Sequence, residues 1–157
     1  MSARPAGRVV VAGLGNVWRR DDGVGPAVAL RVAHAAGSGV DVIVNAGEPV
    51  DLLDAWRGAD LAVVIDAMRS GLAPGAYLRI EGDAGEVRAV GVSGHVYPLP
   101  HVVDLARALN AMPGKLLIFA VEGADFTAGD GLSPEVSAAV EGLARAVLEE
   151  VSAACAP

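Results

Sequence analysis

The sequence predicts an α/β fold in which a mostly parallel sheet is covered by helices on both faces. Short runs of consecutive apolar residues, typical of strands buried on both sides, alternate with longer segments whose apolar residues recur every three or four positions. Strands that alternate with helices build right-handed βαβ units and hence parallel sheets. A length of 157 residues without a repeat or linker fits one domain spanning residues 1–157.

Each expected element has a recognisable pattern or boundary. In chain order these are a strand over 8–13, a helix over 24–36, a strand over 40–44, a helix over 50–56, strands over 61–66 and 76–80, a helix over 101–111, a strand over 115–121 and a final helix from 134. Pro26 falls in the first turn of the first helix, where its missing N–H costs nothing, and Gly37 stops that helix. The third strand ends on Asp66. Ser133 and Pro134 start the last helix as N-cap and first helical residue.

Composition excludes several functional classes. With 12 basic and 19 acidic residues the net charge is −7, which disfavours a general nucleic-acid binder. No apolar stretch approaches the roughly 18 residues of a membrane span, and the first residues do not resemble a signal peptide. The single cysteine, Cys155, excludes a disulfide framework and a thiolate zinc site. We therefore expect a cytoplasmic protein, and a monomer.

The glycine-rich turn after the first strand is the first candidate motif. It reads Gly13-Leu14-Gly15-Asn16-Val17-Trp18, whereas a dinucleotide fingerprint needs glycine at position 18, where a tryptophan blocks close approach of a pyrophosphate. The second strand is followed by Asn45, where an acidic residue for the ribose is expected. We therefore expect no dinucleotide here.

Two carboxylates and one imidazole follow strands of the predicted sheet. Asp21 and Asp22 precede a helix, and although one aspartate is accounted for as a helix cap, two adjacent carboxylates repel each other and exceed what a cap requires. Asp66 closes a central strand, and His95 lies in a glycine-rich loop. Ligands of such sheets bind beyond the carboxyl ends of the strands. Together these groups offer the O, O, N donors of a divalent transition metal.

Other candidates are weaker. His101 is placed where a helix begins, and His34 lies in mid-helix, where we expect it to be solvated. No nucleophile system is present, because Cys155 lies near the C-terminal end and neither a Gly-x-Ser-x-Gly elbow nor a helix-borne metalloprotease motif occurs. The residues alone thus indicate a metal-binding, hydrolase-like α/β domain.

Taken together and in order, the motifs closely resemble the NiFe-hydrogenase maturation endopeptidases. The matching stretches are Gly13-Leu14-Gly15-Asn16, Asp21-Asp22-Gly23-Val24-Gly25, Val64-Ile65-Asp66-Ala67, Ser93-Gly94-His95 with Leu99, and Gly131-Leu132-Ser133-Pro134 with Val136. The resemblance implies a three-layer α/β/α sandwich with a twisted central sheet. It also implies a protease that removes the C-terminal extension of the hydrogenase large-subunit precursor after nickel insertion.

The resemblance assigns the site to Asp22, Asp66 and His95, as both metal-binding and catalytic residues. The nickel is expected to arrive with the precursor, held by its cysteines, and Zn²⁺ or Cd²⁺ is expected to substitute in vitro. Two positions depart from the family pattern. His101 stands where an acidic residue is usual, which leaves open whether it assists or replaces His95, and Gly123 stands where proline is frequent, in a loop expected to face the substrate.

Two alternatives belong to other classes. Gly-Leu-Gly-Asn after an N-terminal strand also resembles peptidyl-tRNA hydrolase, but that family has an Arg-His-Asn stretch in place of Asp21-Asp22-Gly23 and needs a basic face for tRNA. The second is a chaperone that senses nickel in the immature subunit without cutting it. The three site residues do not separate it from a protease, since both need the metal contact.

Overall fold

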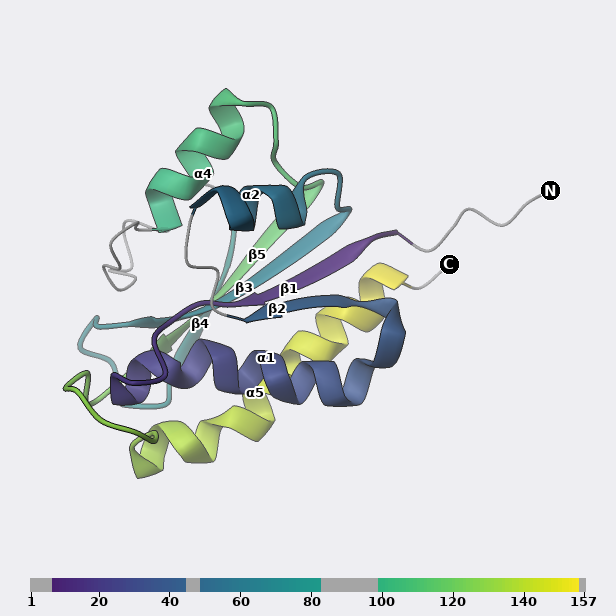
Figure 1. Cartoon of the computed structure of the whole chain (residues 1–157). Coiled ribbons are helices and arrows are strands. Elements are labelled where there is room, and N and C mark those ends of the chain that lie inside the picture. The colour runs from purple at the N-terminus through teal and green to yellow at the C-terminus, as the bar shows by residue number, and fades with distance from the viewer. Residues whose placement is uncertain (1–6, 45–48, 83–98, 156–157) are drawn as a thin grey trace.

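A five-stranded sheet, seen in a computed structural model that describes residues 7–44, 49–82 and 99–155, forms the centre of the molecule (Figure 1). Its strand order is β2-β1-β3-β5-β4, and all neighbours are parallel except β4, which runs antiparallel to β5 at one edge. The strands are β1 (Val9–Gly13), β2 (Asp41–Val44), β3 (Leu61–Met68), β4 (Tyr77–Glu81) and β5 (Lys115–Glu122).

Helices cover both faces of this sheet. Helices α2 (Pro49–Trp56) and α4 (Leu99–Ala108) lie on one face, and α1 (Val24–Ala36) and α5 (Pro134–Cys155) lie on the other (Figure 1). Two short 3₁₀ turns, η1 (Arg20–Gly23) and η2 (Gly37–Gly39), flank α1. The predicted three-layer α/β/α sandwich with a mostly parallel sheet is confirmed.

The alternation of side chains along β3 divides the core into two halves. Val64 and Met68 pack into the apolar cluster beneath α2 and α4, whereas Val63 and Ile65 pack into the cluster beneath α1 and α5. Because successive strand residues point to opposite faces, Asp66 belongs with Val64 and Met68 on the α2/α4 face. Every residue of β3 is buried, which explains why all of its residues except Asp66 are apolar.

The largest differences between predicted and observed element boundaries are in β3, α4 and α5, and the other boundaries agree to within one residue. Strand β3 continues two residues past Asp66 to Met68, so this carboxylate lies within the strand and the prediction that it ends the strand was wrong. Helix α4 spans Leu99–Ala108, two residues before the predicted start and three before the predicted end. Helix α5 extends to Cys155, well beyond its clearest apolar pattern. Within the described residues, no helix has both the length and the apolar character needed to cross a bilayer.

Candidate functional site

The glycines of the turn after β1 allow three pieces of backbone to pack together. Gly15 has φ +137°, and a Cβ at this position would lie 1.8 Å from the carbonyl oxygen of Asp22. A Cβ on Gly13 would lie 2.3 Å from the Gly25 carbonyl oxygen, and a Cβ on Gly25 would lie 2.3 Å from that of Leu14. The turn is thus folded back on η1 and the start of α1. This close packing explains the glycines, so a phosphate-binding role is not needed to explain them.

Asp22 is buried inside this turn, with only 6% of its surface exposed. Its Oδ2 accepts a hydrogen bond of 2.8 Å from the backbone amide of Asn16. The Asn16 side-chain oxygen in turn accepts a hydrogen bond of 2.9 Å from the amide of Trp18. Asp22 does not cap α1, because the residue at the N-cap is Gly23 and no side chain makes a capping hydrogen bond there.

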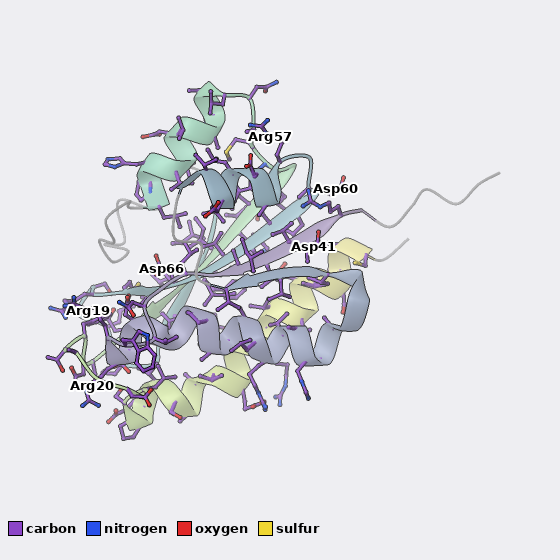
Figure 2. The ribbon with its side chains drawn as sticks, viewed as in Figure 1. Arg19, Arg20, Asp41, Arg57, Asp60 and Asp66 are labelled. Carbon is purple, nitrogen blue, oxygen red and sulfur yellow. The ribbon has the colours of Figure 1, made fainter. Side chains whose placement is uncertain are left out.

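Asp66 is fully buried on the neighbouring strand. Its Oδ1 accepts a hydrogen bond of 2.9 Å from the amide of Ala67, and its backbone is in register with Ala120 of β5. The amide of Leu14 donates a 2.9 Å hydrogen bond to the carbonyl of Ile65, which joins the glycine turn to β3. The structure therefore brings the turn of Asp22 and the strand position of Asp66 together at the carboxyl edge of the sheet, where Figure 2 labels Asp66.

Asp21, the other member of the pair, has a separate task. Its carboxylate, 0% exposed, accepts hydrogen bonds from the amides of Ala124 (2.7 Å) and Asp125 (2.9 Å), and from both the amide (2.7 Å) and the hydroxyl (2.8 Å) of Ser133. Burial opposes its ionisation, but these hydrogen bonds from Ser133, Asp125 and Ala124 outweigh it and hold the pKa of Asp21 below its ordinary value. Asp21 thus fastens the loop between β5 and α5 to η1. Since neither aspartate caps α1, the expectation that one member of the pair caps this helix was wrong.

Glu122 is a further buried carboxylate at the carboxyl edge of the sheet, and the sequence analysis did not single it out. It is 3% exposed at the end of β5, and it accepts hydrogen bonds from the amide and hydroxyl of Ser70 and from the amide of Gly71. Burial raises the pKa of Glu122, but the hydrogen bonds from Ser70 and Gly71 and the charge of Arg69 lower it by more. The net pKa therefore lies below the ordinary value. A glutamate that ends an otherwise apolar run was the available signal.

Gly123, which departs from the family pattern, leaves room for its neighbours. A Cβ here would lie 2.5 Å from the ring of Phe126 and 3.1 Å from the Cβ of Asp21. The guanidinium of Arg69 stacks over the Phe126 ring in a cation–π contact, with its Cζ 4.6 Å from the ring centroid. Glycine at this position therefore permits close packing of the β5–α5 loop against η1.

The three histidines lie in different parts of the chain. His95 lies outside the described residues, so its assignment as the third metal-contacting residue stays a prediction. His101 is exposed in the first turns of α4, and His34 is exposed on α1, as predicted. Among residues 7–44, 49–82 and 99–155, no three His, Cys, Asp or Glu side chains are grouped to hold a metal ion. Asp22 and Asp66 offer carboxylate oxygens only, and a site for a transition metal needs a further donor.

Comparison with known proteins identifies the family. The hydrogenase maturation protease family matches residues 29–150, a stretch that includes Asp66 and His95 and begins after Asp22. The chain belongs to this family, and the predicted resemblance is confirmed.

Individual relatives agree with this assignment. The chain is 31% identical over 133 residues to the hydrogenase expression/formation protein HupD of Thiocapsa roseopersicina, a match that covers 82% of this chain and 60% of HupD. The hydrogenase maturating endopeptidase HybD of Escherichia coli has the same fold, with a TM-score of 0.81 at 24% identity and 92% coverage of both chains. The NiFe hydrogenase maturation protease HybD of Thermococcus kodakarensis gives a TM-score of 0.73 at 22% identity, covering 92% of this chain and 99% of its own.

Proposed function

We propose that the protein is an endopeptidase that removes the C-terminal extension of a NiFe-hydrogenase large-subunit precursor after nickel insertion. In this proposal Asp22, Asp66 and His95 contact the nickel that the precursor carries. The observation that carries it is the placement of two buried carboxylates, Asp22 and Asp66, at neighbouring positions of one sheet edge. Family membership supplies the reaction class.

The donor set suits a metal presented by another protein. Asp66 lies on the face of the sheet that α4 covers, and His95 precedes α4 by four residues in the sequence. Two carboxylate oxygens and an imidazole nitrogen without a thiolate make a modest binding site. Nickel already held by the precursor reaches the site at high effective concentration once the two proteins touch. A bridged metal centre worth about 3–4 kcal/mol gives a preference of a few hundredfold for a loaded precursor over an empty one.

The proposed chemistry follows from the same contact. A divalent ion polarises a nearby carbonyl and lowers the pKa of water, so peptide hydrolysis beside the precursor's nickel needs no serine or cysteine nucleophile. We place this encounter in the cytoplasm, between a monomer of this protein and the precursor.

The test compares nickel-loaded and nickel-free precursor, each mixed with metal-stripped protein, and follows the loss of mass by mass spectrometry. Cleavage of the loaded precursor alone is expected. Asp22→Asn, Asp66→Asn and His95→Gln should each slow it by about 100-fold or more, because a metal contact is lost. Asp54→Asn is the control, since Asp54 is exposed on α2.

Other outcomes would contradict the proposal or its residue assignment. Equal cutting of the empty precursor, or activity restored by Zn²⁺ on the protease alone, would indicate an ordinary metalloprotease. Stable binding of the loaded precursor without any mass loss would indicate the nickel-sensing chaperone. Full activity of His95→Gln, combined with loss of activity in His101→Gln, would move the third contact to His101.

A further inference from the structure

The two tryptophans of the chain have opposite environments. Trp56 is 0% exposed in the core, whereas Trp18 is 68% exposed and its neighbour Val17 is 43% exposed. An indole left in water forgoes the hydrophobic stabilisation that Trp56 gains by burial. Tryptophan is enriched in protein–protein interfaces and among the few residues that carry most of their binding energy.

Trp18 does not lie on a loose loop, because its backbone is held on both sides. Its amide donates to the Asn16 side-chain oxygen at 2.9 Å, and its carbonyl accepts a hydrogen bond of 2.8 Å from the amide of Gly129. Arg19 and Gly129 form a β-bridge, and the amide of Arg20 donates to the Gly129 carbonyl at 3.2 Å. The indole is therefore presented from a fixed backbone, which lowers the entropy lost when it meets a partner.

The loop that holds Trp18 is itself anchored. Asp21 accepts four hydrogen bonds from Ala124, Asp125 and Ser133, and the amide of Asp21 donates to the Asp125 carbonyl at 2.9 Å. Residues 16–21 and 124–133 thus form one braced surface, which we call the Trp18 platform. Figure 2 shows Arg19 and Arg20 on it, at the same end of the sheet as Asp66.

The Trp18 platform is continuous with the candidate site. Asn16 joins them, because its side chain accepts from the amide of Trp18 while its own amide donates to Oδ2 of Asp22 at 2.8 Å. A partner whose metal reaches Asp22 must therefore cover the surface next to Trp18. Under the proposed function, the protein that brings the metal to Asp22 is therefore the one that covers this surface.

We propose that Trp18 is a docking anchor for the large-subunit precursor, making apolar contact with the precursor's surface beside its nickel. The inference rests on the proposed function and names the surface by which the precursor binds. Truncation of a central aromatic anchor weakens protein complexes strongly, while its neighbours contribute little. Since the contact is the same before and during the reaction, its loss should raise KM and leave kcat unchanged.

The experiment uses the full-length protein with nickel-loaded precursor and measures both binding, by calorimetry, and cleavage. Trp18→Ala is expected to weaken binding by about tenfold or more and to raise KM by a similar factor. Trp18→Phe should retain most of the affinity, since a ring still fills the contact. Leu30→Ala is the matched control, because Leu30 is 59% exposed on α1 and a comparable loss of exposed apolar surface there should change neither value.

The outcomes separate this inference from the proposed function. Unchanged affinity and KM in Trp18→Ala, or an equal loss in Leu30→Ala, would overturn the docking role while leaving the protease proposal intact. Binding that depends on Trp18 without any cleavage by the unmodified protein would support the anchor and contradict the protease. A fall in kcat at unchanged KM would also overturn the inference, because it would place Trp18 in the reaction step instead of in docking.

Discussion

Asp21 holds Ser133 by two hydrogen bonds, one from the backbone amide to Oδ1 and one from the hydroxyl to Oδ2, although the residues lie 112 positions apart in the chain. This contact connects the turn after β1 to the start of α5. The adjacent aspartates therefore have different roles. Asp21 connects two loops, and Asp22 lies in the turn of the candidate site.

The first prediction concerns the stability that Asp21 provides. Asp21→Asn removes a charged, buried acceptor and leaves the partly buried amides of Ala124, Asp125 and Ser133 poorly satisfied, so the free energy of unfolding should fall by about 2–4 kcal/mol. Urea unfolding followed by circular dichroism measures this. Asp130→Asn, an exposed change in the same loop, should stay within about 0.5 kcal/mol. A loss in Asp21→Asn no larger than in Asp130→Asn would contradict the bracing role.

The second prediction is a loss of stability in acid. The folded-state pKa values of Asp21 and Glu122 lie below their ordinary values of 3.8 and 4.5. The stabilisation is therefore complete above the ordinary values and is lost as pH falls through the lower folded-state values, because the unfolded chain then binds more protons. Urea midpoints measured from about pH 7 down to about pH 3 should fall most steeply below about pH 4.5. Glu122→Gln should show a shallower fall, and an unchanged slope would contradict the assignment.

The fold was predictable because its signals are local. The valines of α1 recur at the spacing of a helix and are buried as expected, and the unbroken apolar runs at β1, β3 and β5 became the central strands. The boundary error at Asp66 arose because a carboxylate normally marks a strand end. Here it lies inside the strand, with Oδ1 bound to the amide of Ala67.

The candidate site was only partly predictable. The placement of Asp22 and Asp66 at one edge of the sheet follows from the rule that parallel strands bring their carboxyl ends to the same edge. The roles of Asp21 and Glu122 depend on partners 112 and 52 positions away, and nothing in the local pattern indicates such distant hydrogen bonds. Sequence reasoning therefore recognised that one aspartate of the pair had a second task, but it did not identify the β5–α5 loop as the partner.

A third prediction is that Cys155 is dispensable. This cysteine is free and exposed at the last residue of α5, and Figure 1 shows that end of α5 at the opposite end of the molecule from the β1 turn. Cys155→Ala should leave precursor cleavage and the unfolding midpoint unchanged, and thiol alkylation should have no effect on cleavage. Loss of cleavage in a folded Cys155→Ala protein would require a thiol nucleophile, which this position does not favour.

The last prediction compares two glycine-to-alanine changes that should act in opposite directions. At Gly15 the backbone has φ +137° and the added methyl would lie 1.8 Å from the carbonyl oxygen of Asp22, so the turn must distort. Gly15→Ala should lower the free energy of unfolding by about 3 kcal/mol or more and displace Asp22. At Gly142, in the exposed middle of α5, no atom lies within 4 Å of the added methyl.

Gly142→Ala should therefore raise stability by about 0.5–1 kcal/mol, because alanine loses less conformational freedom in a helix. Urea unfolding of both variants gives the free energies. Nuclear magnetic resonance of the Asn16 amide, which donates to Asp22, reports on the turn. Its resonance should shift in Gly15→Ala and stay in place in Gly142→Ala. A stable Gly15→Ala protein with an unmoved Asn16 amide would show that the glycine is not what brings the turn onto Asp22.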